Sequence, residues 1–80
     1  MKRKVISVSA IENYSLELVF DDGTHRLFDA NPYLEFGDFK ELKDPSIFAT
    51  AHVFMGTVQW SNELDFAPDT LYEESKLLVF

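Results

Sequence analysis

Closely spaced strand and turn signals near the start of the chain limit what it can fold into. Residues 14–20 place Tyr14, Leu16, Leu18 and Phe20 at every second position, the period of a half-buried β-strand. The turn sequence Asp21-Asp22-Gly23 follows at once, and residues 24–29 predict a further strand. Strands joined by such short turns run antiparallel, because a parallel crossover needs roughly a dozen residues or more.

The order of elements along the chain predicts an α+β fold. An antiparallel three-stranded meander is expected at about 4–11, 14–20 and 24–29, with Glu12-Asn13 as its first turn. Short helices are expected at about 39–42 and 45–49, a β-hairpin at about 51–54 and 57–60, and a short C-terminal helix at about 68–74. An apolar tail completes the chain. Local hairpins and segregated helices favour this class over a parallel α/β sheet.

Two prolines mark expected helix starts. Asp44 is a candidate N-cap with Pro45 at the first helical position, and Pro68 is followed by Asp69, whose carboxylate favours the positive end of the helix dipole. In the second hairpin, Met55-Gly56 is the expected two-residue turn.

Composition predicts one domain, residues 1–80, in a reducing compartment. Apolar residues make up 46% of the chain and aromatic residues 15%, which is enough for one core. The absence of cysteine excludes disulfides, thiolate metal sites and a cysteine nucleophile, and favours a cytoplasmic location. Lys2-Arg3-Lys4 and the apolar residues after it imitate a signal peptide, but Ser7 and Ser9 interrupt that run, and a strand is expected instead.

The charge balance argues against nucleic acid and membranes as partners. The net charge is −7, and residues 41–80 carry two basic residues against seven acidic ones. Phosphate binding depends on Lys and Arg, and Lys2-Arg3-Lys4 is the one basic cluster. No apolar stretch approaches the ~20 residues that cross a bilayer. The expected partner is another protein, of basic charge, or a second copy in a homo-oligomer.

No catalytic, cofactor or metal motif is recognisable. Neither GxxxxGK[ST] nor GxGxxG occurs, and no serine lies in a nucleophile elbow. His25 and His52 are the candidates for a base or a metal ligand beside carboxylates, although their surroundings have no known ligand spacing. A small metal-binding or ligand-binding domain or enzyme built on these histidines is the alternative to a non-enzymatic protein with no cofactor.

An interaction surface is expected from the C-terminal part of the chain. The apolar side chains of the tail are expected to be shielded from water. The tail can pair as a sixth strand within the molecule or add as a strand to another chain. Trp60 and Tyr72 combine large rings with polar tips, which suits both a core margin and a binding hot spot. The candidate interaction residues are Trp60, Asp65, Asp69, Tyr72, Leu77, Leu78, Val79 and Phe80.

Several short motifs occur in an order that resembles a known family. They are Lys4-Val5-Ile6-Ser7-Val8, Phe20-Asp21-Asp22-Gly23, Arg26-x-Phe28-Asp29, Phe39-x-x-Leu42-Lys43-Asp44, Thr57-Val58-x-Trp60 and Asp65-x-x-Pro68-Asp69-x-Leu71-Tyr72-Glu73. Over residues 4–73 the chain resembles domain-of-unknown-function family 2442. The family usually has a proline and a glycine after the tryptophan. Here Trp60-Ser61-Asn62-Glu63 stands in their place, and Asn62 is expected to supply the left-handed residue of the turn.

The resemblance implies a small bacterial domain of mixed α and β structure without an established activity or agreed site residues. Members often look like the smaller partner in two-gene pairs, which suggests a toxin–antitoxin-like arrangement. Together with the acidic charge and the tail, this leads to the hypothesis of a non-enzymatic protein-interaction module, an antitoxin-like partner of a neighbouring small protein.

Overall fold

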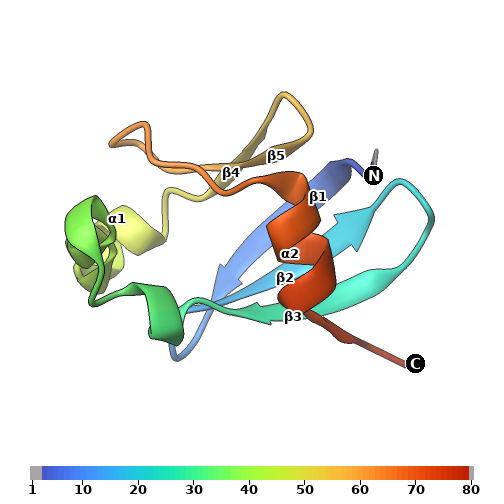
Figure 1. Cartoon of the computed structure of the whole chain (residues 1–80), viewed down its shortest axis with the longest axis horizontal. Coiled ribbons are helices and arrows are strands. Elements are labelled where there is room, and N and C mark those ends of the chain that lie inside the picture. The colour runs from blue at the N-terminus through green and yellow to red at the C-terminus, as the bar shows by residue number, and fades with distance from the viewer. Residues whose placement is uncertain (1–2, 80) are drawn as a thin grey trace.

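A four-stranded antiparallel sheet forms one layer of the protein. The computed structural model describes residues 3–79. Strands β1 (Val5–Ile11), β2 (Ser15–Phe20), β3 (His25–Asp29) and β6 (Lys76–Leu77) lie side by side in that order. The second layer contains the hairpin of β4 (His52–Phe54) and β5 (Thr57–Gln59), together with helix α2 (Pro68–Glu74) (Figure 1). The predicted α+β class is confirmed.

The turn between β1 and β2 differs from the predicted one. Ile11 pairs with Ser15, so the loop contains three residues, and Tyr14 belongs to it rather than to the strand. Asn13 and Tyr14 both have left-handed backbones, with φ of 60° and 56°. Such a backbone is rare for a bulky residue and costs about 1–3 kcal/mol. Burial holds it in place, since the Tyr14 ring meets the edge of Phe48 with the centroids 5.3 Å apart.

The next turn agrees with the prediction, and so does the buried face of β2 from Leu16 to Phe20. Gly23 has φ of 84°, as the Asp21-Asp22-Gly23 turn requires. Leu16 pairs with Phe28 and with Ala10, so these side chains share the face of the sheet that points to the second layer.

The C-terminal tail pairs within the molecule. Leu77 lies opposite Arg26 and Lys76 opposite Leu27, and the Leu78 amide donates to the His25 carbonyl at 2.8 Å. The tail therefore forms the fourth, outermost strand of the sheet, β6, rather than a free end. Phe80 lies outside the described residues.

Three short helices cover one end of the sheet. They are η1 (Asn31–Tyr33), η2 (Gly37–Lys43) and α1 (Pro45–Phe48). The first was not predicted, and the second is a 3-10 helix that extends beyond the expected 39–42. Asp44 caps α1 as predicted, since its carboxylate accepts the Ser46 amide at 3.0 Å.

The β4–β5 hairpin has the predicted two-residue turn. Met55 and Gly56 have φ of 50° and 80°, a left-handed pair that matches the twist of the flanking strands. The Gly56 carbonyl accepts the Val5 amide at 2.8 Å and ties the hairpin to the start of β1.

The turn after Trp60 corrects one prediction. Its left-handed residue is Glu63, with φ of 67°, and not Asn62. The Asn62 side chain accepts the Leu64 amide at 3.2 Å and donates to Glu41 at 3.1 Å, so Asn62 stabilises the turn through its side chain.

Aromatic and aliphatic side chains fill the space between the two layers. The largest fully buried ones are Trp60, Phe20, Phe28, Leu16, Leu18, Leu42, Leu71, Val5 and Val58. None of the helices within residues 3–79 is long and apolar enough to cross a membrane.

Candidate functional site

Trp60 belongs to the core and not to a surface. Its side chain is 0% exposed, and its indole N–H donates to the Phe48 carbonyl at 3.0 Å. The ring also lies against Phe66, with centroids 5.7 Å apart. Of the two interpretations of this residue, the interaction surface is therefore wrong, because the indole nitrogen finds its partner inside the protein.

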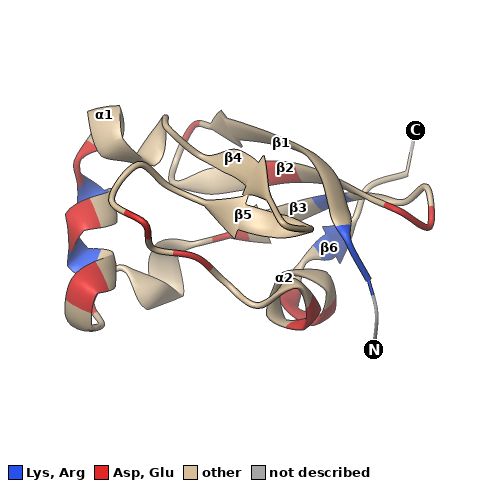
Figure 2. Ribbon diagram, turned by 90° about the horizontal axis from the view of Figure 1, so that it is seen from above, with Lys and Arg blue, Asp and Glu red and all other residues tan. Residues whose placement is uncertain are grey.

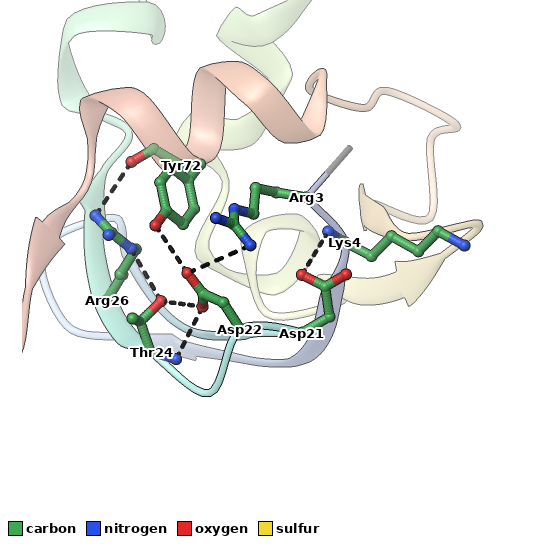
Figure 3. A network of polar contacts seen from close by, with 7 residues as sticks. All are labelled: Arg3, Lys4, Asp21, Asp22, Thr24, Arg26 and Tyr72. Carbon is green, nitrogen blue, oxygen red and sulfur yellow. Dashed lines mark hydrogen bonds and ion pairs between the residues drawn. The ribbon is translucent and has the colours of Figure 1, made fainter. Parts of the chain in front are cut away.

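Tyr72 lies at the centre of a polar network that attaches α2 to the sheet. Its ring is stacked between two guanidinium groups, 5.3 Å from Arg3 and 3.8 Å from Arg26, measured to the ring centroid (Figure 3). Its hydroxyl donates to the Asp22 carboxylate at 2.8 Å. The Phe20 ring meets it at a right angle from the core side, 5.0 Å away. Cation–π, edge-to-face and hydrogen-bond contacts thus fix one side chain from several directions.

Asp22 and Arg26 connect this network to the β2–β3 turn and to the end of α2. Asp22 accepts the amide and the hydroxyl of Thr24 at 2.9 and 2.6 Å. Arg26 donates to the Thr24 hydroxyl at 3.1 Å and to the Tyr72 carbonyl at 3.4 Å. The hydrogen bonds from Thr24, followed by the one from Tyr72, hold the pKa of the Asp22 carboxyl well below its ordinary value.

Acid is expected to remove the contribution of Asp22 to stability. Because the folded pKa lies below the ordinary value of 3.8, the folded protein binds this proton less tightly than the unfolded chain does. The contribution is complete above the ordinary pKa and disappears as the pH falls through the folded pKa. Urea unfolding of the wild type and of Asp22→Asn should give a stability difference near pH 7 that shrinks below about pH 3.

Asp21→Asn is the matched control for this titration. Asp21 is the adjacent exposed residue, and its carboxylate accepts the Lys4 amide at 3.3 Å. If both variants show the same pH dependence, the network at Tyr72 does not perturb Asp22.

A mixed acidic and apolar surface lies beyond this network, and we call it the C-terminal surface. It consists of Asp69, Glu73 and Glu74 on α2 and of Leu77 and Val79 on and after β6. Leu77 is 54% exposed and Val79 is 88% exposed. Helix α2 contains no Lys or Arg, and Figure 2 shows acidic residues on it and on the connection that leads to it from β5.

The predicted surface residues differ in position and exposure. Asp65 is exposed on that connection and forms an isolated bridge with Gln59. Asp69 is half-buried in the first turn of α2, and Leu78 is half-buried beside β3. Tyr72 is half-buried between Arg3 and Arg26. The structure thus brings Asp69, Tyr72 and the tail together on the α2–β6 unit, while Trp60 lies inside the protein.

Two adjoining hollows lie where the β1–β2 turn meets η1. The larger one, here called the groove, has a volume of about 600 Å³, and its lining residues are Ala10, Ile11, Glu12, Asn13, Tyr14, Asn31, Pro45, Phe48 and Ala49. The smaller one, here called the acidic hollow, has a volume of about 320 Å³ and is lined by Asn13, Ser15, Leu27, Asp29, Asn31, Glu74 and Lys76. Residue types alone do not indicate either hollow, because both are lined by the β1–β2 turn, whose backbone is left-handed at Asn13 and Tyr14.

The two histidines lie in different sheets. Both ring nitrogens of His52 have partners, the Thr50 carbonyl at 2.9 Å and the Gln59 side chain at 3.1 Å. His25 is exposed on β3. Within residues 3–79 no group of three or more His, Cys, Asp or Glu side chains is arranged to hold a metal ion.

Comparison with known proteins identifies one family. A family model described as a protein of unknown function (DUF2442) matches residues 5–76. The resemblance predicted from the sequence is therefore confirmed over nearly the whole chain. No curated protein and no solved structure matches it.

Proposed function

The chain belongs to the DUF2442 family of proteins of unknown function, and from that premise we propose that it is a non-enzymatic module that binds another protein. The observation that carries the proposal is the C-terminal surface. There, exposed Leu77 and Val79 lie beside the acidic helix α2 at the outer edge of the sheet. Apolar side chains at a sheet edge attract a further strand or an apolar partner surface.

The rigidity of this surface supports a binding role. The contacts of Tyr72 with Arg3, Arg26 and Asp22 fix α2, and the Arg26 bond to the Tyr72 carbonyl holds the end of the helix just before β6. A surface held in one conformation loses little conformational entropy when it binds. The partner can therefore meet a preformed edge.

The charge of the protein indicates the charge of its partner. The protein has a net charge of −7 and no basic residue in α2, so it favours a partner of positive charge. The negative charge attracts such a partner over a distance and can form ion pairs with it at the margin of the interface. We therefore propose a small basic protein encoded nearby, toward which this cytoplasmic chain acts as an antitoxin-like partner.

Removing the exposed apolar groups of the tail is expected to abolish this association. Leu77→Ser with Val79→Ser changes two exposed side chains and leaves the backbone pairing of β6 with β3 in place. We expect the wild type, tagged and expressed at native level in its own host, to co-purify with a stoichiometric basic protein. The double variant should lose at least about nine-tenths of it, which from near-saturated binding requires an affinity roughly 100-fold weaker, about 2.7 kcal/mol.

Phe36→Ser is the control for lowered surface hydrophobicity. Phe36 is 65% exposed, lies between η1 and η2, and is not among the residues of the C-terminal surface. The proposal fails if Phe36→Ser reduces recovery of the partner as much as the double variant does, or if the double variant, shown to be folded by circular dichroism, retains the partner fully.

A further inference from the structure

The groove and the acidic hollow adjoin each other. Asn13 and Asn31 line both, so the two hollows meet at a shared wall. That wall is held firmly, because the Asn31 side-chain amide donates to the Asn13 carbonyl at 2.7 Å and to Asp29 at 2.7 Å. The acidic hollow also reaches Glu74 and Lys76, and so it leads from the groove to the end of α2 and to β6 of the C-terminal surface.

The groove is preformed and mainly apolar. The Ala30 amide donates to the Tyr14 carbonyl at 3.0 Å, the Tyr14 hydroxyl donates to the Lys43 carbonyl, and the Tyr14 ring rests on Phe48. These contacts fix a left-handed turn that opens the space between Ile11 and α1. Its volume is within the range of sites that hold small apolar groups.

The charged residues that line the two hollows favour a positively charged group on a ligand. Glu12 is the one charged residue among the described residues that line the groove, and Asp29 and Glu74 line the acidic hollow with Lys76. Lys43 lines neither hollow, and its ammonium is held by Glu35 at 2.6 Å. Three carboxylates against one ammonium thus line the two hollows. Asp29 already accepts hydrogen bonds from Asn31, and Glu74 accepts one from the Tyr33 hydroxyl. The net negative charge that the three carboxylates leave favours a positive group on the ligand.

We propose that the groove and the acidic hollow together bind an extended segment of a basic protein, with an apolar side chain in the groove and a lysine or arginine in the acidic hollow. The inference rests on the proposed function in that both name a basic protein partner. It adds a second place of contact, centred on the β1–β2 turn and η1, which shares Glu74 with the C-terminal surface. In an extended segment, side chains two positions apart point the same way, which suits two adjoining hollows.

A short peptide tests the proposal on the isolated chain. The probe is acetyl-Leu-Gly-Lys-amide, titrated into the ¹⁵N-labelled protein at low salt and followed by two-dimensional NMR. We expect saturable shifts at residues 10–14, 29–31, 45–49 and 74–76. The peptide with Glu in place of Lys should bind about three- to tenfold more weakly, and the peptide with Gly in place of Leu should bind more weakly as well.

Variants of the protein locate the site. Ala49 is exposed in the groove with an ordinary helical backbone, φ −67°, so Ala49→Phe fills the groove without backbone strain and should weaken binding at least about tenfold. Glu12→Gln should weaken it about threefold, whereas Asp38→Asn, which removes an equal charge on η2, should have no effect. Shifts outside the hollows, equal binding of the Lys and Glu peptides, or unchanged binding to folded Ala49→Phe would overturn the proposal.

The two proposals fail separately. Absence of peptide binding, together with a partner that is lost from the tail double variant, removes the groove proposal and leaves the interaction module. Peptide binding at the hollows, together with a folded double variant that still retains the partner, keeps the groove and removes the tail.

Discussion

Replacing Trp60 with alanine is expected to lower the free energy of unfolding by about 3–5 kcal/mol, the range for a fully buried large aromatic side chain. The indole is 0% exposed and contacts Phe48 and Phe66, so its removal leaves a cavity that the rigid hairpin and α1 cannot close. A domain of this size has a total stability of roughly 4–12 kcal/mol. Urea unfolding followed by circular dichroism should show a variant that is barely folded or unfolded.

Trp60→Phe separates packing from hydrogen bonding. This variant keeps an aromatic ring but removes one of the two N–H groups that donate to the Phe48 carbonyl, the other being the Ala51 amide. It should cost less, about 1–3 kcal/mol. Equal stability of Trp60→Ala and the wild type would mean that the indole is not buried as described.

Replacing Tyr72 with alanine is expected to cost about 2–4 kcal/mol and to loosen α2. The loss combines the edge-to-face contact with Phe20, the stacking between Arg3 and Arg26 and the burial of the ring. The change should appear as a lower urea midpoint and as rapid hydrogen exchange of the α2 amides.

Tyr72→Phe is the matched control, since it keeps the ring contacts and removes the hydroxyl that donates to Asp22. Its loss should be clearly smaller than that of Tyr72→Ala. If the two variants are equally unstable, the hydrogen bond and not the stacked ring holds α2.

Local signals in the sequence identified most of the fold. Pro68 and Asp44-Pro45 begin α2 and α1 as predicted, because a proline at the first helical position and a capping carboxylate act within one turn. Gly23 and Met55-Gly56 form the predicted turns for the same reason. The 3-10 helices were missed or given wrong bounds, since the packing of Leu34, Phe39 and Leu42 against the core decides them.

The candidate site was less predictable, because it depends on contacts between distant residues. Tyr72 meets Asp22 across fifty positions in the chain, and no spacing in the sequence indicates that pair. Trp60 has the same amphipathic chemistry as Tyr72, and its position after β5, facing α1, is what makes it part of the core. The groove depends on Asn13 and Tyr14 in a left-handed turn, which residue types alone do not predict for a tyrosine.

The pairing with β6 makes β3 an interior strand of the sheet. This pairing depends on helix α2, because α2 directly precedes β6 in the chain. With α2 docked, β3 is an interior strand whose backbone groups are hydrogen-bonded on both sides at Arg26 and Leu27. With α2 undocked, the same strand becomes an open edge, the kind of surface that recruits other strands. Because the Tyr72 contacts attach α2 to the sheet, weakening them is expected to expose this edge of β3 to strand exchange more often.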